Sequence, residues 1–280
     1  MRTVVGPGRW VWGLAGLATV LALTFGGVAI VARAWSTPQP PQQVTVTQTV
    51  TVVKPVTSLT VQSYGGAIQI TGRPAGRVQV SDTLTYGPLA GGPPVVTESL
   101  SRGHLILADP ACAQDGECMV SFAVTVPPGV VVTAISEGGS LAVSGTGAAN
   151  LDSGGGPVSA TRIGGPLTVS TEGGSLLVDG LSGALHADTF GGSLTADRVD
   201  AGAATVTTDG GDARITFAAG PQQVTVSTDG GLAALTVPGG PYALTADSNG
   251  GPQSVGIATD PAARSSITIS SGGGPVQVTP

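Results

Sequence analysis

From about residue 130 to the C-terminus, apolar and polar residues alternate with period two, and the alternation recurs about every 18–20 residues. Each repeat reads apolar, any, apolar, any, Ser or Thr, any, Gly, Gly, and a second alternating stretch follows the glycines. Period-two alternation predicts β-strands, so each repeat contains two short strands separated by a glycine corner. The first stretches of the repeats are Val132-Ala134-Ser136, Ala149-Leu151-Ser153, Leu167-Val169-Thr171, Leu185-Ala187-Thr189, Ala204-Val206-Thr208, Val224-Val226-Thr228, Leu244-Ala246-Ser248 and Ile267-Ile269-Ser271.

A repeat of this length cannot bury its apolar side alone. Stacking successive repeats about 4.8 Å apart buries a continuous apolar column and completes the backbone hydrogen bonds of the strands. The pattern therefore predicts an all-β fold, a parallel β-solenoid with about 18–20 residues per coil, over residues 132–280. Because the Ser or Thr has inward parity, we expect these hydroxyls to form a ladder that donates hydrogen bonds along the column. The paired glycines permit positive φ and close backbone approach at the corner.

One further copy of the repeat, Leu59-Val61-Ser63 before Gly65-Gly66, lies far upstream of the others. Residues 73–131 do not follow the period and contain longer alternating stretches. We expect residues 56–131 to form an N-terminal β segment that widens or caps the solenoid, because the terminal units of stacked arrays are usually atypical. The last strand of the chain, Val276–Val278, has no obvious cap and is a candidate pairing surface.

Residues 10–32 form an uncharged stretch bracketed by Arg9 and Arg33. A helix of this length would span about 35 Å, enough to cross a hydrocarbon core of about 30 Å. All three tryptophans of the chain lie at the ends of the stretch, where aromatic rings favour the headgroup layer. The sequence thus predicts one N-terminal transmembrane helix with the lipid bilayer as its partner. The bias of flanking arginines places residues 1–9 in the cytoplasm and the C-terminal part outside the cell membrane.

A cleaved signal peptide is the alternative for this segment, because Ala32-Arg33-Ala34 resembles an A-x-A cleavage site. Signal peptides usually carry an apolar stretch of about 7–15 residues, and this one is longer. The rest of the chain is exported in both cases. Residues 33–55 form a linker that begins as a Pro/Gln spacer. Its alternating Val/Thr run, Val44–Val53, is either an extended stalk or a first edge strand.

The two cysteines, Cys112 and Cys118, lie six positions apart in a turn-rich loop. An oxidising compartment would allow them to close a short disulfide, which is the pairing that we predict. A zinc site is the weaker interpretation, because this spacing without a nearby histidine is not typical of zinc ligands.

Composition limits the classes of function. Only 10% of the residues are charged, and the net charge is −6, whereas a nucleic-acid-binding protein needs a basic surface. The chain contains 45 glycines and 41% hydrophobic residues, which fits a glycine-punctuated β-rich body and argues against disorder. We therefore expect no nucleic acid among the partners.

Signals for catalysis are sparse. The two histidines, His104 and His186, are far apart in the sequence, and His186 has the outward parity of its strand. The chain has no nucleophile elbow, zinc-protease, P-loop or dinucleotide motif, and the repeated Gly-Gly pairs recur at the period of the fold. We predict no catalytic residue, no cofactor-binding residue and no metal ligand.

One pair of acids is a candidate cation site. Asp209 and Asp229 occupy the same corner position in adjacent repeats, so stacking would place them about 4.8 Å apart, with Glu172 and Asn249 flanking. The other interpretation is a pair of solvent-facing turn residues. The second is favoured, because a hard cation such as Ca²⁺ needs six or more oxygen ligands.

Several segments together resemble a known family. They are Leu105-Ile106-Leu107, the cysteine pair, the run from Val120 to Pro127, and Ser136-Glu137-Gly138-Gly139 with its successors. This progression resembles the bacterial putative-adhesin family, a domain of unknown function with a solenoidal β fold, and in particular its membrane-anchored actinobacterial members. The resemblance covers roughly residues 56–280. It implies a cell-envelope protein, in a family with links to envelope-stress systems, and it brings no catalytic residues.

Two functions from different classes follow. The first is a membrane-anchored, extracytoplasmic, adhesin-like scaffold that binds an envelope polymer, another protein or another copy of itself without catalysis. The second is a carbohydrate-active β-helix enzyme of the envelope, which would need at least two acids in one groove. The missing acid/base constellation favours the first function.

Overall fold

The computed structural model describes residues 43–74, 76–87, 93–109 and 118–280. All of these residues belong to one compact unit, 40–280. Within the described ranges every regular element is a β-strand, which confirms the all-β class. The described part contains no helix of the length and apolarity that a membrane span requires. The predicted transmembrane helix at 10–32 lies outside the described residues.

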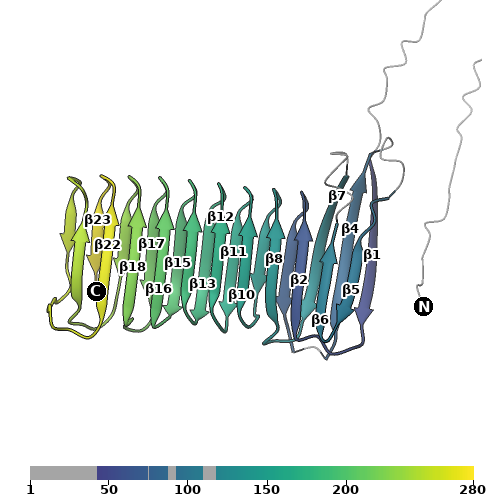
Figure 1. Ribbon diagram of the computed structural model, residues 1–280, viewed down its shortest axis with the longest axis horizontal. Helices are drawn as coiled ribbons and strands as arrows, with labels where there is room; N and C mark the ends of the chain where they lie inside the picture. Colours follow the sequence, from purple (N-terminus) through teal and green to yellow (C-terminus); the bar gives the residue numbers. More distant parts are fainter. Residues whose placement is uncertain (1–42, 75, 88–92, 110–117) are drawn as a thin grey trace, which may run out of the picture. The chain divides into compact units, whose positions relative to one another are not determined.

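The strands form two sheets, called sheet A and sheet B here (Figure 1). Twelve-stranded sheet A contains, in spatial order, β1 (Val44–Val52), β4 (Val78–Tyr86), β7 (Cys118–Val126), β3 (Ile68–Gly72), β9 (Leu141–Ser144), β11 (Val158–Ile163), β13 (Leu176–Ser182), β15 (Leu194–Asp200), β17 (Ala213–Phe217), β19 (Ala233–Thr236), β23 (Val276–Thr279) and β21 (Gln253–Val255). Eleven-stranded sheet B contains β20 (Ala243–Asp247), β22 (Ser266–Ser271), β18 (Gln223–Thr228), β16 (Ala203–Thr208), β14 (Leu185–Thr189), β12 (Leu167–Thr171), β10 (Ala149–Ser153), β8 (Val131–Ser136), β2 (Ser58–Ser63), β6 (His104–Ala108) and β5 (Thr97–Ser101).

From β8 to β19 the chain alternates between the sheets, so one sheet-B strand and the following sheet-A strand make one unit. Each strand pairs in parallel with its counterpart in the next unit, and equivalent positions face each other, as Leu167 faces Leu185. This register is the one that the repeat predicts. We call the resulting series of units the stack.

The C-terminal units are not stacked in sequence order. β22 lies between β18 and β20, and β23 lies between β19 and β21. The proposal that Val276–Val278 is a free pairing surface is therefore wrong, because β23 has a partner on both sides. The inner unit carries the bulkier apolar pair, Ile267 and Ile269, which is fully buried there, while Leu244 and Ala246 of the outermost unit are only partly covered. The more apolar unit takes the inner place.

The upstream copy of the repeat joins the stack directly. β2 pairs with β8 so that Leu59 faces Val132 and Ser63 faces Ser136, although more than seventy residues separate them. The intervening segment adds strands beyond this unit: β6 and β7 continue in parallel, and β5 and β4 then pair antiparallel to them. The Val/Thr run forms β1, the edge strand of sheet A, rather than a stalk.

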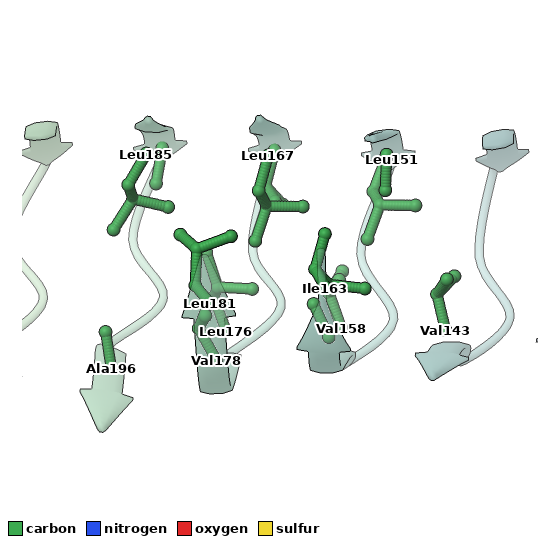
Figure 2. Packing of buried hydrophobic residues seen from close by; sticks show 14 of the residues in the cluster. Val143, Leu151, Val158, Ile163, Leu167, Leu176, Val178, Leu181, Leu185 and Ala196 are labelled. Carbon is green, nitrogen blue, oxygen red and sulfur yellow. The ribbon is translucent and has the colours of Figure 1, made fainter. Parts of the chain in front are cut away.

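The core lies between the sheets. In Figure 2, Leu151, Leu167 and Leu185 stand in one row on sheet B and face the apolar side chains of sheet A. Alternate residues are buried along the inner strands of both sheets, as the period-two pattern predicts, whereas the edge strands β5, β20 and β21 have no buried residue. Burying a Leu or Val side chain contributes about 1.5–3 kcal/mol, so the stack as a whole is stabilised mainly by this continuous column.

The two glycines of each corner have different roles. A Cβ on Gly174 would lie 2.0 Å from the carbonyl oxygen of Gly156 in the neighbouring unit, and one on Gly192 would lie 1.9 Å from that of Gly174. The second glycine is therefore required by close stacking. A Cβ on the first glycine, as at Gly173 or Gly210, would have no atom within 4 Å. In several units the φ of this glycine is positive, as at Gly210 (φ 89°).

The inward hydroxyls are buried as predicted, but their hydrogen bonds run differently. Each donates to the carbonyl oxygen of the second glycine in its own corner: Ser136 to Gly139, Ser153 to Gly156, Thr171 to Gly174, Thr189 to Gly192, Thr208 to Gly211, Thr228 to Gly231 and Ser248 to Gly251. The expected ladder of bonds along the column is wrong for these units, because a carbonyl three residues away is closer at hand. Only Ser63 and Ser271, among these hydroxyls, donate to a neighbouring unit.

Candidate functional site

The outer side of sheet B carries two rows of side chains, polar at every position except Ile135, and we call this surface the hydroxyl face. The strand register aligns one residue from each unit in each row. The first row is Thr60, Thr133, Asn150, Thr168, His186, Thr205, Thr225, Thr268 and Thr245. The second row is Gln62, Ile135, Asp152, Ser170, Asp188, Thr207, Ser227, Ser270 and Asp247.

The spacing of this face follows from the sheet itself. Neighbouring strands lie about 4.8 Å apart, and residues two positions apart on one strand lie about 6.6–6.8 Å apart. Three successive units, β16, β18 and β22, each present Thr followed two positions later by Thr or Ser. The result is a regular lattice of hydroxyl and methyl groups. Neither row contains a Lys or an Arg.

The outer side of sheet A is different. It carries arginines: Arg198 binds the Asp179 carboxylate, Arg214 Nη2 lies 2.9 Å from Asp212 Oδ2, and Arg162 donates to Ser144. Arg162 and Arg198 have positive φ values of 53°, so the strands bend where they lie, and the register shifts between β15 and β17. Around β13–β17 the outer side of sheet A is thus irregular and ion-paired, and it faces away from the hydroxyl face of sheet B.

Asp212 shows how the sheet-A charges are held. The Leu232 N–H donates to Asp212 Oδ1 at 2.9 Å, and this hydrogen bond is the main reason why the pKa of Asp212 is lowered. Arg214 lowers the pKa further. The carboxylate is therefore kept ionised as part of a structural pair.

The histidines lie in the two strands where the sequence placed them. His186 is exposed on the hydroxyl face, as predicted, with its Nε2 3.3 Å from Asp188 Oδ2. His104 is half-buried in β6, and its Nε2 forms a 2.9 Å hydrogen bond with the Thr60 hydroxyl. The two rings lie in units that are separated by several strands of sheet B.

Asp209 and Asp229 lie at the corners of adjacent units and are exposed. The predicted flanking residues are wrong. Phe190 stands between Glu172 and Asp209 in the stack, and Gly272 takes the place next to Asp229, because β22 rather than β20 follows β18. Within the described ranges there is no group of three His, Cys, Asp or Glu side chains that could hold a metal ion.

Asp109 is the site residue that the sequence reading missed. Gln62 pairs with Ala108, so Asp109 occupies the position that Ser63 has in the next unit. Its buried carboxylate accepts hydrogen bonds from the Ser63 hydroxyl at 3.3 Å and the Tyr64 N–H at 3.2 Å. Burial raises the pKa of Asp109 to about 6 despite these bonds. The signal was present: Leu105, Leu107 and Asp109 have the spacing of the repeat with a carboxylate in place of the hydroxyl.

Cys118 begins β7, whereas Cys112 lies outside the described residues. The disulfide between them stays a prediction.

Two shallow depressions lie in the described part of the surface. One, of about 370 Å³, is lined by the loops around Gly220 and Gly239 and by Tyr242, whose hydroxyl donates to the Pro238 carbonyl. The other, of about 450 Å³, lies between Lys54, Leu100 and Arg102. Neither depression is lined by a carboxylate.

Neither a protein-family model nor a curated protein matches the chain. Solved structures do match. A protein from Parabacteroides distasonis, described as a "putative adhesin", is 12% identical with a TM-score of 0.51, over 84% of this chain and 97% of that one. A "putative adhesin" from Bacteroides fragilis is 14% identical with a TM-score of 0.45, over 85% and 98% of the two chains. At such identity the likeness to the first of these shows a shared fold.

Proposed function

We propose that this chain is a membrane-anchored, extracytoplasmic β-solenoid that binds a repetitive polymer of the cell envelope without catalysis, in the manner of an adhesin or scaffold. The parallel register of β8–β19 supports the solenoid. The fold that it shares with a protein described as a "putative adhesin" is consistent with a binding role. The anchor at 10–32, the cytoplasmic N-terminus and the actinobacterial membrane-anchored type rest on the sequence alone.

The hydroxyl face is the observation that carries the binding proposal. A partner that repeats at a fixed interval, such as a polysaccharide, gains the same contact from each successive unit, and many weak contacts add up along one rigid lattice. Hydroxyl groups donate and accept hydrogen bonds, so they suit sugar hydroxyls, and the threonine methyl groups add apolar contact. On the outer side of sheet A the aligned hydroxyls form two shorter rows, Thr125-Thr71-Ser144-Thr161 and Thr216-Thr236-Thr279. Ion-paired residues such as Asp179 and Arg198 lie between these rows, so no row of hydroxyls runs along the whole sheet.

Co-sedimentation with isolated cell-wall polymer tests this proposal. Thr205 and Thr216 are exposed threonines of the same unit, the first on the hydroxyl face and the second on sheet A. We expect Thr205→Lys to lower the fraction of full-length protein that sediments by about fivefold or more, because a long charged side chain interrupts the lattice. The matched variant Thr216→Lys should bind as the parent does. Equal binding by both variants would overturn the assignment of this face.

Membrane topology needs its own test. Protease added to intact cells should degrade residues 43–280 while a tag on residues 1–9 survives, and the chain should fractionate with membranes. A protected C-terminus would overturn the proposed orientation.

The enzyme alternative predicts turnover, which distinguishes it from binding. Incubation with envelope polysaccharides should release no sugar if the chain only binds them. Release of reducing ends that depends on an acid of this chain would replace the binding proposal with the carbohydrate-active one.

A further inference from the structure

β1 is an edge strand with an unusual degree of exposure. It pairs with β4 along all nine of its residues, from Val44 opposite Tyr86 to Val52 opposite Val78, and no described strand pairs with its other side (Figure 1). Its valines point to the inner side of sheet A, yet Val44 is 43% exposed and Val46 and Val50 are only partly buried. Such an edge presents a row of unpaired N–H and C=O groups to another chain.

The other sheet edges carry the protection that β1 lacks. β5 has five residues and includes Glu98, β20 has five and ends at Asp247, and β21 has only three and follows Pro252. Short length, charge and proline all discourage pairing between edges. β1 has no charge, no proline, no glycine and no bulge. Its open edge is therefore not explained by the devices that keep the other edges single.

The sequence of β1 is a palindrome. Val44–Val52 reads VTVTQTVTV in both directions, with Gln48 at its centre. Two copies of this strand placed antiparallel about Gln48 would pair identical residue types throughout: valine with valine, threonine with threonine and glutamine with glutamine. Self-complementarity of this kind is what a twofold symmetric interface requires.

We propose that β1 is the interface of a homodimer in which two copies pair antiparallel, with the twofold axis through Gln48. In this register Val44 faces Val52 of the second copy, and Thr47 faces Thr49 of the second copy. The pairing joins residues of equal parity, so the valine sides of both strands lie on one face and the threonine sides on the other. The half-exposed valines thereby gain apolar cross-strand neighbours, and the free backbone groups gain hydrogen bonds.

The interface closes on itself. Because the same edge is used by both copies, the two A sheets become one continuous sheet and no third copy can add at β1. This separates a defined dimer from open aggregation through an exposed edge. The inference does not depend on the hydroxyl face, which lies on sheet B.

Cysteine cross-linking of the full-length chain in its membrane tests the register. Gln48→Cys should give a covalent dimer on oxidation or with a short thiol cross-linker, because the two Gln48 positions lie opposite each other. Thr47→Cys and Thr49→Cys should cross-link to each other when the two proteins are mixed. The parent chain and Thr216→Cys, which is exposed on β17, are the controls. No dimer at position 48, or one no stronger than at position 216, would overturn the proposal.

A charge exchange tests the same pairing without covalent chemistry. Thr47 and Thr49 lie on the outer side of β1, so Thr47→Lys with Thr49→Lys leaves the buried side unchanged but places like charges opposite each other in the dimer. We expect this variant to raise the dimer dissociation constant about tenfold. A mixture with the Thr47→Glu and Thr49→Glu variant should restore heterodimers. Monomeric parent protein at tens of micromolar in sedimentation would overturn the proposal.

Discussion

The middle of the stack and its two ends obey different rules. From β8 to β19 the units follow the order of the chain. At the N-terminal end β2 lies between β8 and β6, although β6 is nearer to β8 in the sequence, and at the C-terminal end β22 lies between β18 and β20. The repeat motif determines the shape of every unit and the register with which it pairs. At the C-terminal end the more apolar unit, with Ile267 and Ile269, occupies the inner place. At the N-terminal end Leu59 and Val61 of β2 lie inside Leu105 and Leu107 of β6, so apolar character alone does not determine the order of the units. Local sequence therefore predicts the strands of each unit, but it does not predict which unit lies next to it in the stack.

Equivalent positions show the same contrast. In the middle, the second glycine of each corner lies against the second glycine of the next unit, and the inward Ser or Thr binds within its own corner. At the N-terminal end, Gly66 lies against the Val120 carbonyl, and Asp109 replaces the hydroxyl. Substitutions in the regular middle and at the irregular ends should therefore change the free energy of unfolding by different amounts.

The largest effect is expected at the glycine column. Gly174→Ala would bring a Cβ within 2.0 Å of the Gly156 carbonyl oxygen, and backbone on both sides must shift to relieve it. We expect a loss of about 3 kcal/mol or more in the free energy of unfolding, measured by urea titration. Gly173→Ala is the control, since nothing lies within 4 Å of that position, and it should stay within about 1 kcal/mol of the parent. Similar losses for both would contradict the close-stacked column.

The next effect concerns Asp109 in the atypical end unit. The pKa of Asp109 is about 6 in the folded chain, and its ordinary value in an unfolded chain is 3.8. Between these two pH values the carboxyl group is protonated in the folded chain and ionised in the unfolded chain. The contribution of this group to the free energy of unfolding is therefore greatest below about pH 4 and is lost as the pH rises to about 6, a change of about 3 kcal/mol.

Asp109→Asn should remove this pH dependence while keeping the shape of the side chain. Urea unfolding of parent and variant from pH 4 to 7 provides the readout as a difference, because the other carboxylates contribute equally to both curves. The variant should become the more stable protein as the pH rises. Parallel curves would show that Asp109 titrates normally.

A smaller loss is expected at the buried hydroxyls of the middle. The Thr171 hydroxyl donates to the Gly174 carbonyl at 3.3 Å and accepts from the Gly174 N–H at 2.9 Å. Thr171→Val would leave the corner N–H without its bond and should cost about 2 kcal/mol. Thr168→Val on the exposed side of the same strand should change stability by less than about 0.5 kcal/mol. Equal effects would show that these corner bonds contribute nothing.

The smallest effect is a gain. Thr146 is buried, and its hydroxyl has no hydrogen-bond partner among the residues that the structure describes, whereas Ile163 and Leu181 hold the corresponding places in the next units. Thr146→Val replaces the hydroxyl by a methyl group of similar size and should stabilise the chain by about 1 kcal/mol. The reverse change, Ile163→Thr, should destabilise it. A less stable Thr146→Val variant would indicate that this hydroxyl has a partner.

Much of the fold could be predicted from the sequence, for a physical reason. Alternation and glycine corners are local, and they specified the strands, the parallel register and the buried Ser/Thr position. The place of β22 between β18 and β20 could not be predicted, because all the units share the same repeat motif, and the motif does not specify which two units pair. The hydrogen bonds of Ser136 and its equivalents were predicted in the wrong direction, since parity gives the side of a residue but not the nearest acceptor. Asp109 was missed because only hydroxyl residues were sought at that position.

The hydroxyl face was only partly foreseen. The sequence indicated a flat side with repeated hydroxyls, but the alignment of its rows depends on the pairing of β2 with β8 and of β18 with β22. The interface proposed at β1 depends on the strand having an open edge, which no pattern within the strand reveals.

The order of the units at the C-terminal end tests the central claim most directly, because a parallel stack with β22 between β18 and β20 differs there from simple stacking in chain order. Thr225 faces Thr268, and Thr268 faces Thr245, so Thr225 and Thr245 lie two strands apart. The cysteine pair Thr225→Cys with Thr268→Cys should close a disulfide under mild oxidation much faster than Thr225→Cys with Thr245→Cys, as followed by peptide mass spectrometry. Faster closure of the second pair, or equal rates for both, would contradict the account.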